Sequence, residues 1–162
     1  MKNYGHRVLL IGYGNPGRLD DGLGPALVER LQAKALPGLD LDADYQLSPE
    51  DALAVAGHDV AIFADAAVAG PEPFCFARIG SDGASSGLGS HSVEPAEVAA
   101  LARELFGAAT ATYALGIRGY AFDAFGEGLS KQAACNLARA SEFIEEVIRN
   151  RSYEQAASCP VM

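Results

Sequence analysis

The 162 residues are enough for one domain with a sizeable core, and 49% hydrophobic with 20% charged residues is an ordinary composition for a globular chain. A net charge of -9 and a pI near 4.7 argue against nucleic acid or an anionic membrane as partner. No stretch approaches the roughly 18 uninterrupted apolar residues of a transmembrane helix. We therefore expect a cytoplasmic protein with no membrane or nucleic-acid partner.

The chain opens with a pattern typical of strand, turn and helix. The apolar run 8–11 predicts a strand covered on both faces, and it is too short and leads too directly into the glycine turn 12–17 to be a signal peptide. A helix is expected over 22–35, where apolar residues recur every fourth position: Leu23, Leu27, Leu31 and Ala35.

The middle of the chain predicts two strands around a short helix, and then a third strand. Residues 39–47 are a more polar strand, and 59–64 are an apolar strand closed by Asp65. Between them, Ser48 is expected to cap a helix with Asp51 completing a capping box, and this helix ends near Gly57. A further strand is expected over 74–79.

The second half begins with a Gly/Ser-rich loop, 81–90, that leads to His91. A helix with Pro95 at its first position ends at Gly107, and 112–117 form the last strand. Ser130 is expected to cap a long final helix. Alternating strands and helices predict an α/β fold with a mostly parallel sheet between two helical layers, in a single domain over 1–150 with a flexible tail over 151–162.

The cysteines suggest a reducing compartment. There are three, an odd number, and none forms a CxxC pair, which disfavours a disulfide framework or a zinc ribbon. Cys75 and Cys135 are expected to be small buried residues. The last four residues, from Cys159, match a prenylation box in form, but Pro160 fits it poorly.

Three polar residues far apart in sequence are expected to meet at one edge of the sheet. Asp21 follows the first strand, Asp65 follows the strand 59–64, and His91 ends the loop. Carboxyl ends of parallel strands share an edge, and two carboxylates with one imidazole suit a divalent first-row metal ion. Each residue taken alone also has a structural explanation. Asp21 could stabilise the N-terminus of the following helix, Asp65 could cap a turn, and His91 could be exposed to solvent without a role.

Neighbouring polar residues are expected to be structural. Asp20 is interpreted as a charge at the helix start, and His6 and His58 as structural histidines. Gly12, Gly14 and Gly17 match a dinucleotide fingerprint by spacing, but acidic residues follow and no fitting acid closes a second strand, so NAD binding is disfavoured.

At these positions the chain resembles the hydrogenase maturation proteases, endopeptidases that trim the C-terminus of the NiFe hydrogenase large subunit. The shared elements are G-x-G-N at 12–15, D-D-x-x-G at 20–24, a strand ending in Asp65-Ala66, and Ser90-His91. Segments 45–47, 50–52 and 116–120 are similar to the branch that includes proteases for soluble, bidirectional-type hydrogenases.

The resemblance implies a twisted five-stranded sheet and a catalytic and nickel-contacting set of Asp21, Asp65 and His91. It also implies that nickel arrives with the substrate, the precursor of the large subunit, and that cadmium or another divalent ion can substitute in vitro. A monomer is expected. One departure concerns 45–48, where many members have an Asp-Gly-Gly-like turn and this chain has Gln46, so a role assigned to that aspartate does not transfer.

Three alternatives remain open from the residues. A non-cleaving chaperone of the nickel-loaded large subunit would use the same three residues. A peptidyl-tRNA hydrolase shares the G-x-G-N-P-G turn, although Asp20 and Asp21 stand where its histidine segment should come and the charge is -9. A general metallopeptidase lacks support because no HExxH occurs, and neither a G-x-S-x-G elbow nor a cysteine near a histidine in sequence supports a serine or cysteine nucleophile.

Overall fold

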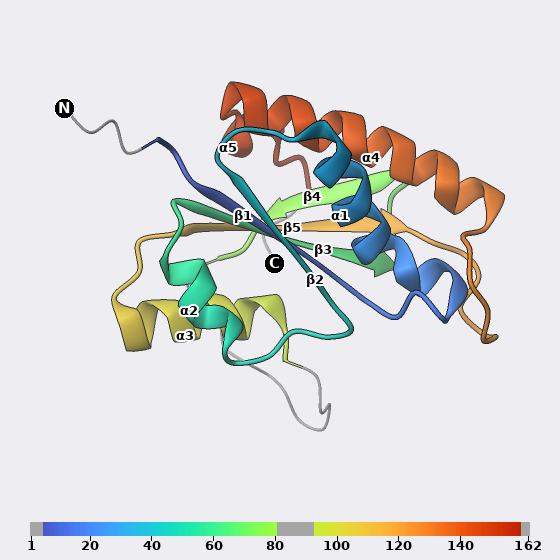
Figure 1. The fold of residues 1–162 in the computed structure, drawn as a ribbon, viewed down its shortest axis with the longest axis horizontal. Helices are drawn as coiled ribbons and strands as arrows, with labels where there is room; N and C mark the ends of the chain where they lie inside the picture. Colours follow the sequence, from blue (N-terminus) through green and yellow to red (C-terminus); the bar gives the residue numbers. More distant parts are fainter. Residues whose placement is uncertain (1–4, 81–92, 160–162) are drawn as a thin grey trace.

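The computed structural model describes residues 5–80 and 93–159. Its centre is a five-stranded sheet in the order β2-β1-β3-β5-β4 (Figure 1). Strands β2, β1, β3 and β5 run parallel to one another, and the edge strand β4 pairs antiparallel with β5. The strand bounds are β1 Val8–Tyr13, β2 Leu39–Asp44, β3 Val60–Ala67, β4 Phe74–Arg78 and β5 Ala111–Arg118. The predicted mostly parallel sheet is therefore confirmed.

Helices cover both faces of the sheet, which gives the three layers expected from sequence (Figure 1). On one face lie α1 (Leu23–Lys34) and the long α4 (Lys131–Asn150), together with α5 (Tyr153–Ala156). On the other face lie the shorter α2 (Asp51–Ala56) and α3 (Pro95–Phe106).

The apolar run of β1 forms a strand because it supplies both cores at once. Val8 and Leu10 belong to the core under α1 and α4, whereas Leu9 and Ile11 belong to the core under α2 and α3. All four side chains are buried. This is the physical reason that the sequence shows a continuous apolar run and not an alternating one.

The helix ends follow the expected signals. Ser130 precedes α4, and its hydroxyl accepts a hydrogen bond from the Ala133 amide at 3.3 Å. The start of α2 is the exception, because Glu50 and not Ser48 is its N-cap and no side chain caps it. The Asp51 carboxylate accepts from the Ser48 amide at 2.8 Å, so only one half of the predicted capping box forms. Gly107 ends α3 with φ of 63°, a left-handed conformation that costs glycine little.

The strand boundaries differ from the predictions by up to three residues, most at the ends of β2 and β3. β2 ends at Asp44, so 45–47 lie outside it. β3 continues to Ala67, so Asp65 lies inside the strand, paired with Gly116 of β5, and does not close it. The sequence could not show this, because the apolar run stops at Ala64 whereas the pairing with β5 continues.

The C-terminal segment also differs from the expected frayed tail. Residues 153–156 form α5, and the Tyr153 side chain is buried against the α4 side of the core. The amides of Ser158 and Cys159 donate to the Phe76 carbonyl on β4, at 3.1 and 3.2 Å.

The expectations for the cysteines were wrong. Cys75 on β4 forms a disulfide with Cys159, and Cys135 on α4 is exposed and free. Cys159 lies in the segment predicted to be a flexible tail. An odd number of cysteines does not exclude a disulfide between two of the three. The count consequently gives no support to a reducing compartment.

Candidate functional site

The carboxyl ends of β1 and β3 define the candidate site, and the turn after β1 brings Asp21 there. Asp21 lies in a short 3-10 helix, η1 (Leu19–Gly22), and its Oδ2 accepts from the Asn15 amide at 2.8 Å. Gly14 has φ of 138°, and a Cβ at this position would lie 2.0 Å from the Asp21 carbonyl oxygen. The turn can therefore hold Asp21 this close only because Gly14 has no side chain.

Asp65 reaches the same region because β3 is longer than β1. Its pairing with β1 stops at Ala64, and only β5 continues beside Asp65. Strand alternation places Asp65 on the same face as Phe63, the face covered by α2 and α3. The carboxylate is thus partly buried beyond the end of β1.

Asp21 and Asp65 are close enough for their charges to interact. Burial raises the pKa of Asp65 to about 6, and the negative charges of Asp21 and Glu94 add to this rise. Hydrogen bonds from the Ala66 amide and the Tyr13 side chain oppose the rise in pKa without cancelling it. None of the ion pairs among the described residues includes Asp21 or Asp65.

Sequence reasoning missed two residues of this site. Tyr13, the last residue of β1, lies on the same face as Asp65 and is hydrogen-bonded to it, and burial raises the pKa of the tyrosine above its usual value. Glu94 precedes α3, and its negative charge adds to the rise in the pKa of both Tyr13 and Asp65. Period-2 alternation along β1 could have indicated Tyr13, whereas Glu94 gives no such signal because it only precedes the Pro95 that begins a helix.

His91 lies outside the described residues. Within the described ranges, no group of three or more His, Cys, Asp or Glu side chains is arranged to hold a metal ion. The charges of Asp21 and Asp65 interact, but a shared role of the two carboxylates and the predicted imidazole remains an expectation from sequence.

Asp20 is not the predicted charge at the helix start but a buried hydrogen-bond acceptor for distant residues. Its side chain is fully buried and accepts four hydrogen bonds, three from amides and one from a hydroxyl. The donors are the Tyr120 amide (2.8 Å), the Ala121 amide (2.9 Å), the Ser130 amide (2.7 Å) and the Ser130 hydroxyl (2.7 Å). Asp20 thus fastens the segment between β5 and α4 to the turn after β1.

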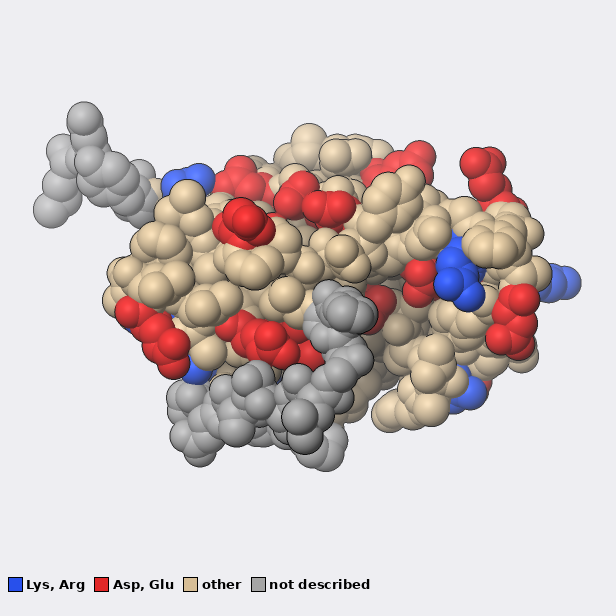
Figure 2. Space-filling model, turned by 90° about the horizontal axis from the view of Figure 1, so that it is seen from below, with Lys and Arg blue, Asp and Glu red and all other residues tan. Residues whose placement is uncertain are grey.

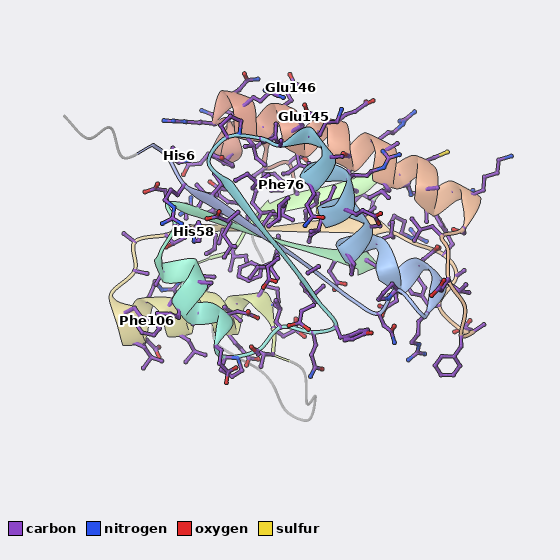
Figure 3. The ribbon with its side chains drawn as sticks, viewed as in Figure 1. His6, His58, Phe76, Phe106, Glu145 and Glu146 are labelled. Atoms are coloured by element: carbon purple, nitrogen blue, oxygen red, sulfur yellow. A yellow bond between two sulfur atoms is a disulfide. The ribbon has the colours of Figure 1, made fainter. Side chains whose placement is uncertain are left out.

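The two described histidines are far from this site, as expected. Figure 3 shows His6 and His58 on the side of the sheet where β1 and β3 begin. Asp21 follows β1 and Asp65 lies near the end of β3, so the two acids belong to the other end of these strands. His58 bonds through Nε2 to Asp40 and through Nδ1 to the Ala54 carbonyl, both at 2.6 Å. These contacts explain His58 as a structural residue.

A hollow of about 180 Å³ adjoins the same turn, between the start of α1 and the end of β2. Its wall is formed by Gly14, Pro16, Pro25, Ala43, Asp44 and Tyr45. The Tyr45 side chain is 67% exposed, so an aromatic ring stands open to solvent beside the hollow.

Comparison with solved structures assigns the fold to a class. A NiFe hydrogenase maturation protease, HycI, from Thermococcus kodakarensis is 23% identical and covers 91% of this chain and 96% of its own, with a TM-score of 0.69. The maturating endopeptidase HybD of E. coli is 20% identical over 90% of this chain and 93% of its own (TM-score 0.68). An E. coli endopeptidase solved in solution is 21% identical over 91% and 94% (TM-score 0.72).

The chain therefore has the fold of the NiFe hydrogenase maturation proteases over about nine-tenths of its length. No family model matches the chain, and no curated protein does. Identities near one fifth establish the shared architecture alone. No helix in the described part of the chain is long and apolar enough to span a bilayer.

Proposed function

We propose that this protein is an endopeptidase that removes the C-terminal extension of a NiFe hydrogenase large-subunit precursor after nickel insertion. The observation that carries the proposal is the meeting of Asp21 and Asp65 at the carboxyl edge of this particular fold. The structural relatives HycI and HybD are hydrogenase maturation proteases, and this chain supplies acidic residues at the edge where such a fold places its site.

The charge balance of the site favours a cation. Neither Asp21 nor Asp65 has an ion-pair partner among the described residues. Burial raises the pKa of Asp65, and the charges of Asp21 and Glu94 add to this rise. A divalent ion would relieve this repulsion and lower the pKa of Asp65 again. With His91 the set would be two oxygens and one nitrogen, which suits nickel or cadmium.

In this proposal the nickel is cargo of the substrate. Soft cysteine thiolates of the precursor hold it, and Asp21, Asp65 and His91 complete its coordination only when a loaded precursor docks. Oxygen and nitrogen donors alone would bind the ion weakly. Recognition of the metal would then couple trimming to correct loading, and the ion would polarise the scissile carbonyl or lower the pKa of a water.

Tyr13 and the Asn15 amide hold the carboxylates in place for this role. The Asn15 amide fixes one oxygen of Asp21 at 2.8 Å, and Tyr13 is hydrogen-bonded to Asp65. Asp21 keeps its second oxygen for a ligand, whereas Asp65 also accepts from the Ala66 amide through Oδ1 at 2.7 Å. The chain needs no nucleophilic serine or cysteine for such chemistry.

The test is a cleavage assay with nickel-loaded precursor, followed by gel shift and mass of the product. Wild-type protein should release the C-terminal extension, whereas Asp21→Asn, Asp65→Asn and His91→Ala should each reduce the rate by at least about 100-fold. Asp123→Asn is the matched control, because Asp123 is an exposed carboxylate in the segment between β5 and α4. Full cleavage by all three site variants would refute the assignment.

The same assay separates the two alternatives. A non-cleaving chaperone would bind the loaded precursor and produce no shorter band. A peptidyl-tRNA hydrolase would release amino acid from charged tRNA and leave the precursor intact. The two carboxylates would repel a tRNA phosphate, so the site disfavours the peptidyl-tRNA hydrolase.

A further inference from the structure

The two edges of the sheet are covered differently. At one edge, the carbonyl of Phe76 on β4 accepts hydrogen bonds from the C-terminal amides of Ser158 and Cys159. At the other edge, β2 has no strand beside it in the described part of the chain, and it lies foremost in Figure 1. Open edges present unpaired backbone groups that an extended chain can join as a further strand.

The register identifies the backbone groups that face outward. The Gly14 amide donates to the Asp44 carbonyl at 3.0 Å, so Asp44 faces β1. Because backbone groups alternate along a strand, Asp42 also faces β1, whereas the amides and carbonyls of Leu41 and Ala43 point away from the sheet. The amides and carbonyls of Leu41 and Ala43 are therefore the groups that could pair with an added strand.

The side chains of β2 give its two faces opposite chemistry. Leu39 and Leu41 pack on the core beneath α1. The alternate residues Asp40, Asp42 and Asp44 are all exposed on the other face. Asp40 is already paired with Arg7 and His58.

Unlike Asp40, neither Asp42 nor Asp44 belongs to an ion pair identified among the described residues. Their field reaches α2, because burial first and then the charges of Asp42, Asp44 and Glu50 raise the pKa of Asp51. Figure 2 shows the surface of the whole molecule from below the view of Figure 1. Acidic side chains recur along the upper part of this surface, while Lys and Arg lie toward its two ends.

The strand also leads to the apolar hollow. Ala43, Asp44 and Tyr45 form one wall of the 180 Å³ hollow, and Gly14 of the turn after β1 forms another. A chain lying along β2 would pass the acidic face on one side and reach this hollow at the end of the strand.

We propose that β2 is a docking edge for an extended, basic segment of a partner protein, with its backbone paired to Leu41 and Ala43. Alternate Lys or Arg side chains of the partner segment lie over Asp42 and Asp44. The apolar side chains of that segment lie on the opposite face, toward the hollow. This goes beyond the proposed cleavage, since docking needs neither nickel nor a cut peptide bond. Edge charges that serve only to prevent self-pairing are the competing explanation.

The first experiment measures binding of a probe peptide to the protein without added nickel, by fluorescence anisotropy. The probe is a blocked, labelled nine-residue peptide that alternates lysine and valine. Asp42→Asn and Asp44→Asn should each weaken binding about threefold to fivefold, as expected for an exposed ion pair. The charge-matched controls are Glu142→Gln and Glu146→Gln, two exposed acids of α4, which should leave affinity unchanged.

The second experiment tests for backbone pairing. One probe is N-methylated at every valine and another at every lysine, so only one of them loses the amides that face β2. The proposal requires one methylated peptide to lose at least tenfold in affinity and the other to keep most of it. Equal binding of both would mean that charge alone attracts the peptide, and would overturn the proposal.

Hydrogen exchange gives an independent readout on the protein. Bound peptide should slow exchange of the Leu41 and Ala43 amides about tenfold or more at saturation, while the Asp42 amide, already paired with β1, changes little. Ala43→Pro should abolish this binding yet preserve the β1–β2 ladder, because the amide it removes points outward. Unchanged exchange at both outward amides with peptide bound would refute strand addition.

Discussion

The buried carboxylate of Asp20 makes a sharp prediction about what holds the site edge together. Asp20→Ala would remove the acceptor of three backbone amides and one hydroxyl, all on Tyr120, Ala121 and Ser130. Each buried donor left without a partner costs about 1–3 kcal/mol, and some will be reached by water. We therefore expect the free energy of unfolding to fall by about 3–5 kcal/mol, in the range for breaking a buried charged network.

Asp20→Asn separates charge from shape. Its amide group would replace one acceptor oxygen, and whichever way it turns, an N–H group must face at least one amide donor. The expected loss is about 2–3 kcal/mol. Burial raises the pKa of Asp20, but hydrogen bonds from Ser130, Ala121 and Tyr120 outweigh it, so the pKa lies below its usual value. The wild-type advantage is therefore present at neutral pH and is lost as pH falls through the folded-state pKa.

The assay is urea unfolding followed by circular dichroism at pH 7 and at pH 3. The matched control is Asp123→Asn, an exposed carboxylate in the same segment, which should change stability by less than about 0.5 kcal/mol. An Asp20→Asn protein that unfolds with the wild-type midpoint at pH 7 would refute this account. Asp21→Asn, by contrast, should lose cleavage with little change in stability, which distinguishes the two adjacent acids.

The remaining predictions concern the site, the turn and the C-terminal segment. Because the folded-state pKa of Asp65 is raised from 3.8 to about 6, the folded state binds more protons between these values, and stability should fall by up to about 3 kcal/mol as pH rises from about 4 to 6. Asp65→Asn should flatten this slope in urea titrations, and an unchanged slope would contradict the assignment. Gly12→Ala places a Cβ 2.2 Å from the Gly24 carbonyl and should cost about 1–3 kcal/mol in thermal unfolding, whereas Gly116→Ala, with 3.5 Å to its nearest contact, should cost less. The disulfide of Cys159 closes a separation of 84 residues, so Cys159→Ser should lower stability by up to about 4 kcal/mol without reductant and have no effect with dithiothreitol; equal loss in both conditions would mean that the bond does not form.

The sequence by itself determined the elements whose signals are local. The apolar run from Val8 to Ile11 specified a central strand because burial on both faces requires apolar side chains at every position. Ser130 and Gly107 marked helix ends because caps act on backbone groups only a few residues away. Asp21 and Asp65 were expected at one edge because parallel topology fixes where strands end.

Only the tertiary structure decided the roles of residues whose partners are distant in sequence. Asp20 bonds to residues about 100 positions away, so no local pattern could separate it from a helix-start charge. The partner of Cys75 lies 84 residues on, in a segment without a strong pattern of its own. Tyr13 joined the site because strand alternation and the extra length of β3 place it against Asp65, and these depend on pairing across the sheet.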